Sequence, residues 1–299
     1  MNVLDQLPAG SRVLLVRLRS LGDCVLTTPA LELLGRYRPD LRIAVVVEER
    51  FRSVYEGNPH LAARLAPDWS AVIRFRPRLT LNLHGGTRSL LLTLASGARW
   101  RAGFGHFRHL WAYNIRIPRA QEILGVDRKV HTAEHVAAAM FSLGVPPGEI
   151  PRASLYAPAA PPQAPYAVIH PLASQPDKTW PHGRFVELAR WLRGGGLEPV
   201  FIGAAGDDLT AFAGFRRVQG AALDEVKTLL RGAALFVGND SGPAHMAAAF
   251  GLPVVVLFGS SDPVVWGPWK TAAETLVGPI AEITAGEVKA AVERLRVRA

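Results

Sequence analysis

Short aliphatic segments that alternate with helical patterns constrain this chain most strongly. Each segment is a nearly continuous apolar run, rich in Val, Ile and Leu, rather than an alternation of polar and apolar residues. Such runs are typical of strands that are covered on both faces, as in a parallel sheet. We predict strands over residues 12–17, 41–47, 79–83, 166–170, 199–203, 234–238 and 253–259. The helical patterns between them cover 25–36, 89–95, 183–193, 223–230 and 285–297. This order predicts an α/β fold.

A proline-rich segment divides the chain near its middle. Residues 144–165 read GVPPGEIPRASLYAPAAPPQAP, with seven prolines in 22 positions, a density that no helix or central strand tolerates. At 299 residues the chain is about twice the commonest domain size. We therefore predict two βαβ domains, 1–155 and 156–299. The amphipathic pattern of the last helix leaves open whether it covers its own domain or packs back on the N-terminal one.

Composition restricts the class of protein. Hydrophobic residues make up 49% of the chain and charged residues 20%, and no apolar run reaches the roughly 18 residues that cross a bilayer. The first residues, MNVLDQLPAG, lack the features of a signal peptide. The single cysteine, Cys24, excludes an internal disulfide and a cysteine-cluster metal site. We expect a soluble, cytoplasmic globular protein.

The positive charge is concentrated in one stretch. The net charge is +9, and between Arg74 and Lys129 eleven Arg or Lys residues face two acids, Glu122 and Asp127. One interpretation is an ordinary solvated surface. The other is a surface that meets an anionic partner such as nucleic acid, a phosphorylated glycan or lipid headgroups. Charge alone leaves both open.

A polar hinge joins an apolar strand to a short helix in the segment VGNDSGPAHMAAAFGLPVVVLFG, residues 237–259. The helix is expected to begin near Pro243, with Asp240 or Ser241 as its N-cap. Free backbone N–H groups and the helix dipole make such a helix start an anion site, and pyrophosphate is a common occupant. The alternative is that Asp240 and Ser241 only cap the helix, although capping does not require His245 as well.

The loop after the first strand of the same half supplies a cation. In HPLASQPDKTWPHGRF, residues 170–185, Ser174 and Lys178 lie between a strand and a helix. A lysine there can neutralise a phosphate, although the same residue is also compatible with an ordinary surface position.

The corresponding turn of the first half carries a carboxylate. The segment RLRSLGDCVLTTPALELL, residues 17–34, contains neither GxGxxG nor the Walker sequence, which disfavours dinucleotide and P-loop binding. Asp23 lies at the strand-to-helix turn and is either the N-cap of a helix that begins around Cys24 or a general base. The second role requires the two domains to face each other across a cleft.

Taken together, four segments resemble glycosyltransferase family 9, the heptosyltransferases of the lipopolysaccharide inner core. They are RLRSLGDCVLTTPALELL, LNLHGGTRSLLL, PDKTWPHGRFVELA and VGNDSGPAHMAAAFGLPVVVLFGSSDPVVWGPW, in order from about Arg12 to Trp269. The resemblance implies the GT-B architecture, with two Rossmann-like domains whose parallel sheets face a central cleft. It also implies that the first domain binds mainly the acceptor and the second the nucleotide-sugar donor.

The resemblance implies roles for particular residues. Asp23 matches the family's catalytic base in the SLGD motif. Asp224 matches less closely the position of an acidic residue that contacts the nucleotide ribose. The implied donor-binding residues are Ser174, Lys178, Asp224, Asp240, Ser241, Gly242 and His245. The chain departs from the family in having Asn82 where a DLHG-like motif has Asp, and in an abbreviated segment after WGPWK. These departures bear on the acceptor and the sugar.

The expected activity is inverting transfer of a sugar from a nucleoside-diphosphate donor, ADP-heptose by resemblance, to a lipopolysaccharide core or related lipid-linked or phosphorylated glycan. No DxD-like carboxylate pair stands out, so we expect no metal and no cofactor. We also expect no nucleic-acid partner and a peripheral contact with the cytoplasmic face of the inner membrane. The candidate acceptor residues are Arg88, Arg99, Arg101 and Arg108. The alternatives are another GT-B enzyme, such as a nucleotide-sugar epimerase, and a non-catalytic binder of nucleotides or anionic glycans.

Overall fold

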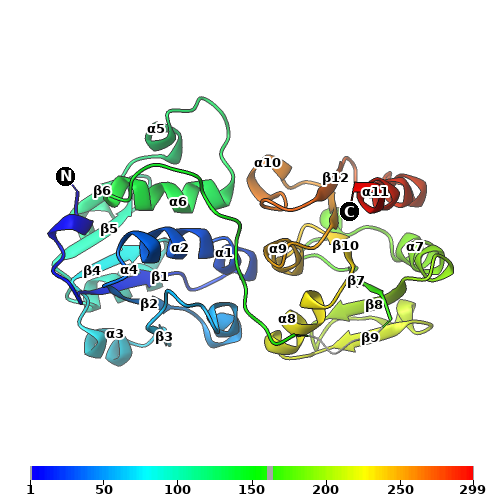
Figure 1. Cartoon of the computed structure of the whole chain (residues 1–299), viewed down its shortest axis with the longest axis horizontal. Coiled ribbons are helices and arrows are strands. Elements are labelled where there is room, and N and C mark those ends of the chain that lie inside the picture. The colour runs from blue at the N-terminus through cyan, green and yellow to red at the C-terminus, as the bar shows by residue number, and fades with distance from the viewer. Residues whose placement is uncertain (1, 160–163, 299) are drawn as a thin grey trace. The chain divides into compact units, whose positions relative to one another are not determined.

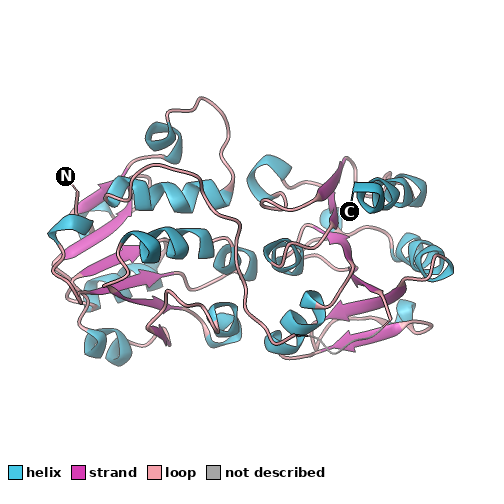
Figure 2. Ribbon diagram, in the orientation of Figure 1, coloured by secondary structure: helices cyan, strands magenta, loops and turns pink. Residues whose placement is uncertain are grey.

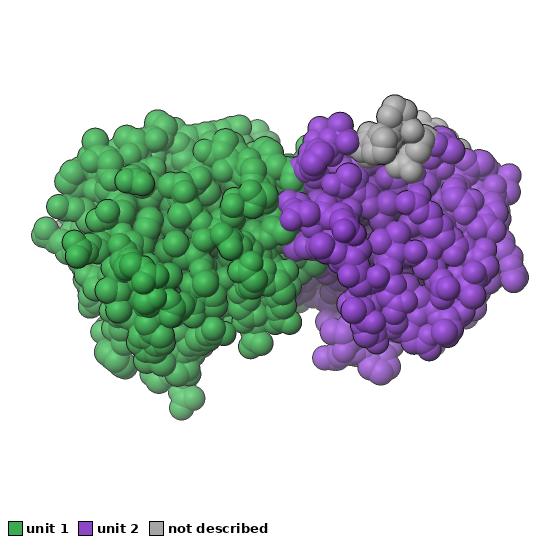
Figure 3. All heavy atoms as spheres, turned by 90° about the horizontal axis from the view of Figure 1, so that it is seen from below, with its two compact units in different colours: residues 1–156 green, residues 157–299 purple. Residues whose placement is uncertain are grey.

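The chain folds into two compact units, Met1–Tyr156 (unit 1) and Ala157–Ala299 (unit 2), which Figure 3 distinguishes by colour. The coordinates are a computed structural model that describes residues 2–159 and 164–298. Residues 145–159 of the proline-rich segment form no helix or strand, as its composition predicts. Residues 160–163, which belong to the same prediction, lie outside the described residues.

The core of unit 1 is a six-stranded sheet in which every neighbouring pair is parallel (Figure 1). The order across the sheet is β3-β2-β1-β4-β5-β6. The strands are β1 (Arg12–Val16), β2 (Arg42–Val46), β3 (Ala63–Leu65), β4 (Leu79–Asn82), β5 (Trp100–Phe104) and β6 (Ile115–Ile117). Because they are parallel, the loops that follow β1, β4 and β5 all leave from one edge, the carboxyl edge of the sheet.

Helices cover this sheet and connect its strands. They are α1 (Leu21–Val25), α2 (Thr28–Tyr37), α3 (Trp69–Phe75), α4 (Thr87–Ala95), α5 (Ala120–Leu124) and α6 (Thr132–Leu143), with 3-10 turns η1 (Leu4–Gln6), η2 (Glu49–Tyr55) and η3 (Leu110–Ala112). The single helix predicted over 25–36 is wrong at its start. The chain forms the short α1 first, and α2 then begins with Pro29 in its first turn, where a missing N–H costs nothing.

Unit 2 repeats the same architecture. Its parallel sheet has the order β12-β11-β10-β7-β8-β9. The strands are β7 (Tyr166–His170), β8 (Glu198–Gly203), β9 (Arg216–Gln219), β10 (Leu235–Asn239), β11 (Val254–Phe258) and β12 (Ala273–Val277). The predicted strand 166–170 is matched in full, and the other predicted strands agree to within one residue at each end.

Helices lie on both sides of the sheet of unit 2, with α8 and α9 on one side and α7 and α11 on the other (Figures 1 and 2). The elements are α7 (His182–Gly194), α8 (Leu223–Arg231), α9 (Gly242–Ala249), α10 (Pro263–Trp266) and α11 (Ala285–Arg298), with η4 (Pro176–Lys178) and η5 (Thr210–Phe212). The last helix, α11, packs on α7, β11 and β12 of its own unit.

The predicted α/β class and GT-B architecture are confirmed, with two parallel six-stranded sheets in sequence. Among the described residues, no helix has both the length and the apolar composition needed to cross a membrane.

Candidate functional site

The carboxyl edge of the sheet in unit 2 gathers most of the predicted donor-binding residues. The central strands β7 and β10 are neighbours, and they end at His170 and Asn239. The buried Asn239 side chain ties the two following loops together, since Nδ2 donates to Pro171 O (3.0 Å) and Oδ1 accepts from Trp180 N (3.1 Å). One amide therefore holds the loop after β7 against the end of β10.

The start of α9 differs from an ordinary capped helix. The helix begins at Gly242, one residue before the position expected, and Ser241 is its N-cap in an extended conformation. The Ser241 side chain does not cap the helix. Its Oγ instead lies 3.1 Å from His170 Nδ1, a hydrogen bond whose donor depends on the ring tautomer. Capping by this hydroxyl, one of the two sequence interpretations, is therefore wrong for Ser241.

His170 is a residue that the sequence interpretation missed. Burial lowers the pKa of its ring to about 4, with the nearby Asp207 carboxylate acting in the opposite direction. The ring is thus neutral at pH 7 and can offer one N–H and one lone pair. Its position as the last residue of a predicted strand, at the edge where ligands bind, was the available signal.

Lys178 lies at the end of η4, in a loop that is held close to β11. A Cβ on Gly259, just after β11, would overlap the carbonyl oxygen of Asp177, so this close approach requires glycine. Two other lysines of unit 2 are paired, Lys227 with Asp224 and Lys289 with Glu187. Lys178 forms no ion pair with any carboxylate of the described residues. Its ammonium group is available to an anion.

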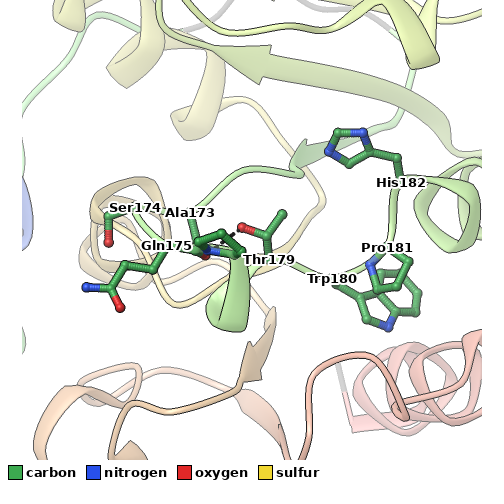
Figure 4. Close-up of a pocket in the computed structure, with 8 residues that line it drawn as sticks. Ala173, Ser174, Gln175, Thr179, Trp180, Pro181 and His182 are labelled. Atoms are coloured by element: carbon green, nitrogen blue, oxygen red, sulfur yellow. Dashed lines mark hydrogen bonds between the residues drawn. The ribbon is translucent and has the colours of Figure 1, made fainter.

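The same loop lines a pocket of about 510 Å³ (Figure 4). Ser174 and Gln175 lie at one end of the segment drawn, and Trp180, Pro181 and His182 lie at the other. Trp180 is fully buried, and its Nε1 donates to Ile283 O at 2.7 Å. The lining residues are 173–176 and 179–182, so neither Lys178 nor any residue of α9 lines this pocket. The pocket therefore lies along the loop after β7 and not at the start of α9.

The remaining donor-binding candidates differ in exposure and in their distance from the start of α9 along the chain. Asp240 is half-buried directly before Ser241, and its N–H donates to Leu257 O at 3.1 Å. His245 is 5% exposed in the first turn of α9, and its ring is in a T-shaped arrangement with Trp266. Asp224 lies in the first turn of α8, after the edge strand β9, and its exposed carboxylate pairs at 2.8 Å with the buried Lys227. This carboxylate already has a structural partner.

Asp23 lies at the carboxyl edge of the other sheet, in unit 1. It is the third residue of α1, whose N-cap is Ser20, so the predicted N-cap position is wrong, although Asp23 takes part in the capping box of this helix. Its Oδ2 accepts from Ser20 N (3.2 Å) and Ser20 Oγ (3.0 Å), and its Oδ1 accepts from the buried Arg17 at 3.2 Å. The side chain remains 23% exposed. Oδ2 is filled by the two bonds from Ser20, whereas Oδ1 keeps lone-pair capacity for a further hydroxyl group.

Asn82 departs from the family pattern, and both polar atoms of its side chain form hydrogen bonds in this fold. Its Oδ1 accepts from the backbone N–H of His84 and Gly85, and its Nδ2 donates to Tyr113 OH at 2.9 Å and Ser89 Oγ at 3.2 Å. Ser89 already donates its proton to backbone carbonyls. A carboxylate at this buried position has no proton to donate, so the surroundings favour the amide.

The structure does not bring the four candidate acceptor arginines together. Arg88 and Arg108 follow β4 and β5 at the carboxyl edge that also holds Asp23. Arg99 and Arg101 lie at the opposite end of β5, a strand of five residues and so roughly 16 Å long. Arg101 also donates to two backbone carbonyl oxygens, of Ala98 and Ala112.

The family model and the similar proteins of known function point to the same family. A family model described as glycosyltransferase family 9 (heptosyltransferase) matches residues 78–289. The chain is 27% identical over 297 residues to lipopolysaccharide heptosyltransferase 3 of Escherichia coli, covering 83% of this chain and 84% of the relative. It is 36% identical over 113 residues to lipopolysaccharide heptosyltransferase 2 of Escherichia coli K12, which is 34% of this chain and 32% of that one.

Solved structures share the fold. A family 9 glycosyltransferase from Veillonella parvula superposes with a TM-score of 0.86 at 22% identity, covering 100% of this chain and 99% of the other. An Escherichia coli heptosyltransferase solved with ADP superposes with a TM-score of 0.79 at 22% identity, covering 95% and 99%. At these identities the likeness establishes the fold.

Proposed function

The chain belongs to glycosyltransferase family 9, and from this premise we propose that it transfers a heptose from ADP-heptose, with inversion, to a lipopolysaccharide core or related glycan acceptor. The single observation that carries the proposal is the local structure at the start of α9. There an N-cap hydroxyl is turned away from its own helix and toward His170, in the region that the family match covers.

The donor site binds the diphosphate through complementary groups. The N-terminus of α9, with its dipole and the N–H of Gly242, faces the negative charge, and the Lys178 ammonium adds a mobile positive charge. As the sugar leaves, charge grows on the β-phosphate, and these groups stabilise it. Ser174, Asp240 and His245 complete the contacts with the donor in this proposal.

On the acceptor side we assign Asp23 as the general base. Arg17 and Ser20 hold its carboxylate in one orientation, and an acceptor hydroxyl donates to it before attacking the anomeric carbon. Asp23 lies outside the matched residues 78–289, so this role rests on the SLGD resemblance and on the local geometry. Of the four candidate arginines, Arg88 and Arg108 share the edge of Asp23 and are the ones we propose for the acceptor.

Three further properties belong to the proposal. The positive charge at the donor site replaces a metal ion, so transfer proceeds in the presence of EDTA. The acceptor is a phosphorylated or lipid-linked glycan, in keeping with the basic stretch of unit 1. The protein makes a peripheral contact with the inner membrane, on its cytoplasmic face.

A nucleotide screen followed by product analysis tests the function. A ligand present at 100 times its dissociation constant adds about 2.7 kcal/mol to stability, so ADP is expected to raise the thermal midpoint more than UDP, GDP or CMP. With ADP-heptose, a core acceptor and EDTA, we expect a glycoside of inverted anomeric configuration by NMR. An isomerised sugar nucleotide formed without acceptor would support an epimerase, and nucleotide binding without turnover would support a binding protein.

His170 is expected to act on the donor through Ser241. When the Ser241 hydroxyl donates to a phosphate oxygen, His170 Nδ1–H donates to Ser241 Oγ and fixes its direction. Losing that bond in H170F should weaken ADP binding roughly 5- to 10-fold by calorimetry. H170N places an amide N–H near the position of Nδ1 and should retain most of the affinity.

The same measurement separates positioning from packing. In an S241A background, H170F should cost little further affinity, because the partner is already absent. Equal losses in both backgrounds would mean that His170 acts only through packing.

A further inference from the structure

Exposed apolar side chains are concentrated on three neighbouring elements of unit 1. In the described part of the chain seven large hydrophobic side chains are exposed, and four of them lie on α3, α4 and η3. These are Trp69 (51% exposed), Ile73 (52%), Leu91 (39%) and Trp111 (70%). We refer to these four residues as the tryptophan surface. Two exposed tryptophans within such a group indicate a binding surface more strongly than scattered single residues do.

The packing of α4 shows why these residues share one surface. Helix α4 packs against α3 on one side and η3 on the other. Its Leu92 joins an apolar cluster with Val72 of α3, and its Leu90 joins another with Ala112 of η3. At 100° per residue, Leu91 lies between these two directions and therefore faces solvent. It links the exposed residues of α3 with those of η3.

On α3 the exposed residues also share a face. Trp69 and Ile73 are four residues apart, so they lie one above the other, while Val72 faces inward and is fully buried. The helix has an ordinary cap, since the Asp68 carboxylate accepts from Ala71 N.

The charge close to this surface is mainly positive. From Trp69 to Trp111 the chain contains seven arginines and no acidic residue, although Arg99 and Arg101 lie at the far end of β5. Arg74 and Arg108 are exposed, and the Arg88 side chain is 60% exposed despite contacts with Pro67 O and, at 3.8 Å, Glu48. Asp68 at the start of α3 and Glu48 beside Arg88 are the acids nearby. Two copies joined through this surface would bring arginines against arginines, which disfavours self-association.

Apolar aromatic residues surrounded by arginines fit the boundary region of an anionic bilayer. Tryptophan prefers the depth of the headgroups, and each arginine gains from a negative surface potential. We propose that the tryptophan surface binds this enzyme to a membrane containing anionic phospholipid. The choice of lipid as the occupant rests on the proposed function, in which the acceptor sugar is carried on a lipid.

Co-sedimentation of the full chain with vesicles tests the proposal. Phosphatidylcholine vesicles with phosphatidylglycerol are expected to retain the protein, and those without it to retain much less. The variant W69S/W111S should partition roughly tenfold more weakly, since each tryptophan contributes apolar area to the contact. The matched control V264S/V277S removes two exposed valines of unit 2 (51% and 57% exposed) and should bind as the wild type does.

A second variant guards against a folding artefact. R74E leaves every apolar side chain in place and should also weaken the partition, as should added salt, because charges are screened over about 10 Å at 0.1 M. No vesicle binding by the wild type would overturn the proposal, and so would binding by both W69S/W111S and R74E that equals the binding by the wild type. So would a dimer of the wild type that W69S/W111S dissociates, since the occupant is then a second copy.

The nucleotide response distinguishes this result from failure of the proposed function. ADP should raise the thermal midpoint of W69S/W111S as much as that of the wild type. If the wild type binds vesicles and no nucleoside diphosphate, the membrane surface stands and the donor assignment fails.

Discussion

Replacing Asp23 by Asn is expected to lower the turnover number by roughly 100-fold or more, which is the usual contribution of a general base. The single amide oxygen can keep the two bonds from Ser20, so the start of α1 should remain folded, while the bond from Arg17 is lost because the amide NH2 cannot accept it. Because the donor binds to other residues in this proposal, the dissociation constant for ADP should hardly change. Turnover is measured with ADP-heptose under saturating donor and acceptor.

Asp68 offers a matched control for this variant. It is also an Asp at a helix start in unit 1, where its carboxylate accepts from Ala71 N. D68N should therefore transfer sugar at the wild-type rate. Full activity in D23N would remove Asp23 from the chemistry, and loss of ADP binding together with activity would point to unfolding.

Replacing Lys178 by Ala is expected to weaken ADP binding by roughly 10- to 100-fold, the range for one charge-assisted hydrogen bond. The ammonium has no carboxylate partner among the described residues, so its removal leaves no buried charge behind. Calorimetry with ADP measures the effect directly. K178R should restore only part of the affinity, since a planar guanidinium does not reproduce a compact ammonium.

The control for this second variant is K289A. Lys289 lies on α11 of the same unit and pairs with Glu187 at 2.6 Å, outside the pocket-lining loop. Its removal lowers the net charge of the protein by the same amount without touching the loop. Equal affinities in K178A and K289A would refute the phosphate role of Lys178.

Much of the fold follows from the sequence because buried parallel strands have a distinctive pattern. The predicted strands 166–170 and 234–238 correspond to β7 and β10, where continuous apolar residues leave little choice of structure. The strands β3, β6, β9 and β12 were not predicted. Each lies at an edge of a sheet and is covered less completely, so its residues, such as RRVQ in β9, carry a weak pattern. The inner strand β5 was also missed, because Trp100 and Arg101 begin it within an arginine-rich stretch.

The sequence predicts which candidate residues follow the ends of strands, and it says less about their contacts. The resemblance to family 9 is confirmed, and it named the donor motif before any coordinates. The sequence did not indicate that Ser241 bonds to His170, because a serine before a helix predicts a cap. It also gave no sign that Lys227 is buried, or that β5 separates Arg101 from Arg108, since both depend on tertiary packing.

Trp180 fixes the loop that carries Lys178 to residues that are remote in the sequence. Its backbone N–H is held by Asn239 at the end of β10, and its ring N–H by the carbonyl of Ile283, immediately before α11. The segment that leads into the last helix thereby helps to fix the loop that carries Lys178. Removing the chain from Ile283 onward would free one side of that loop, so a segment remote in the sequence supports the lysine that we propose for the diphosphate.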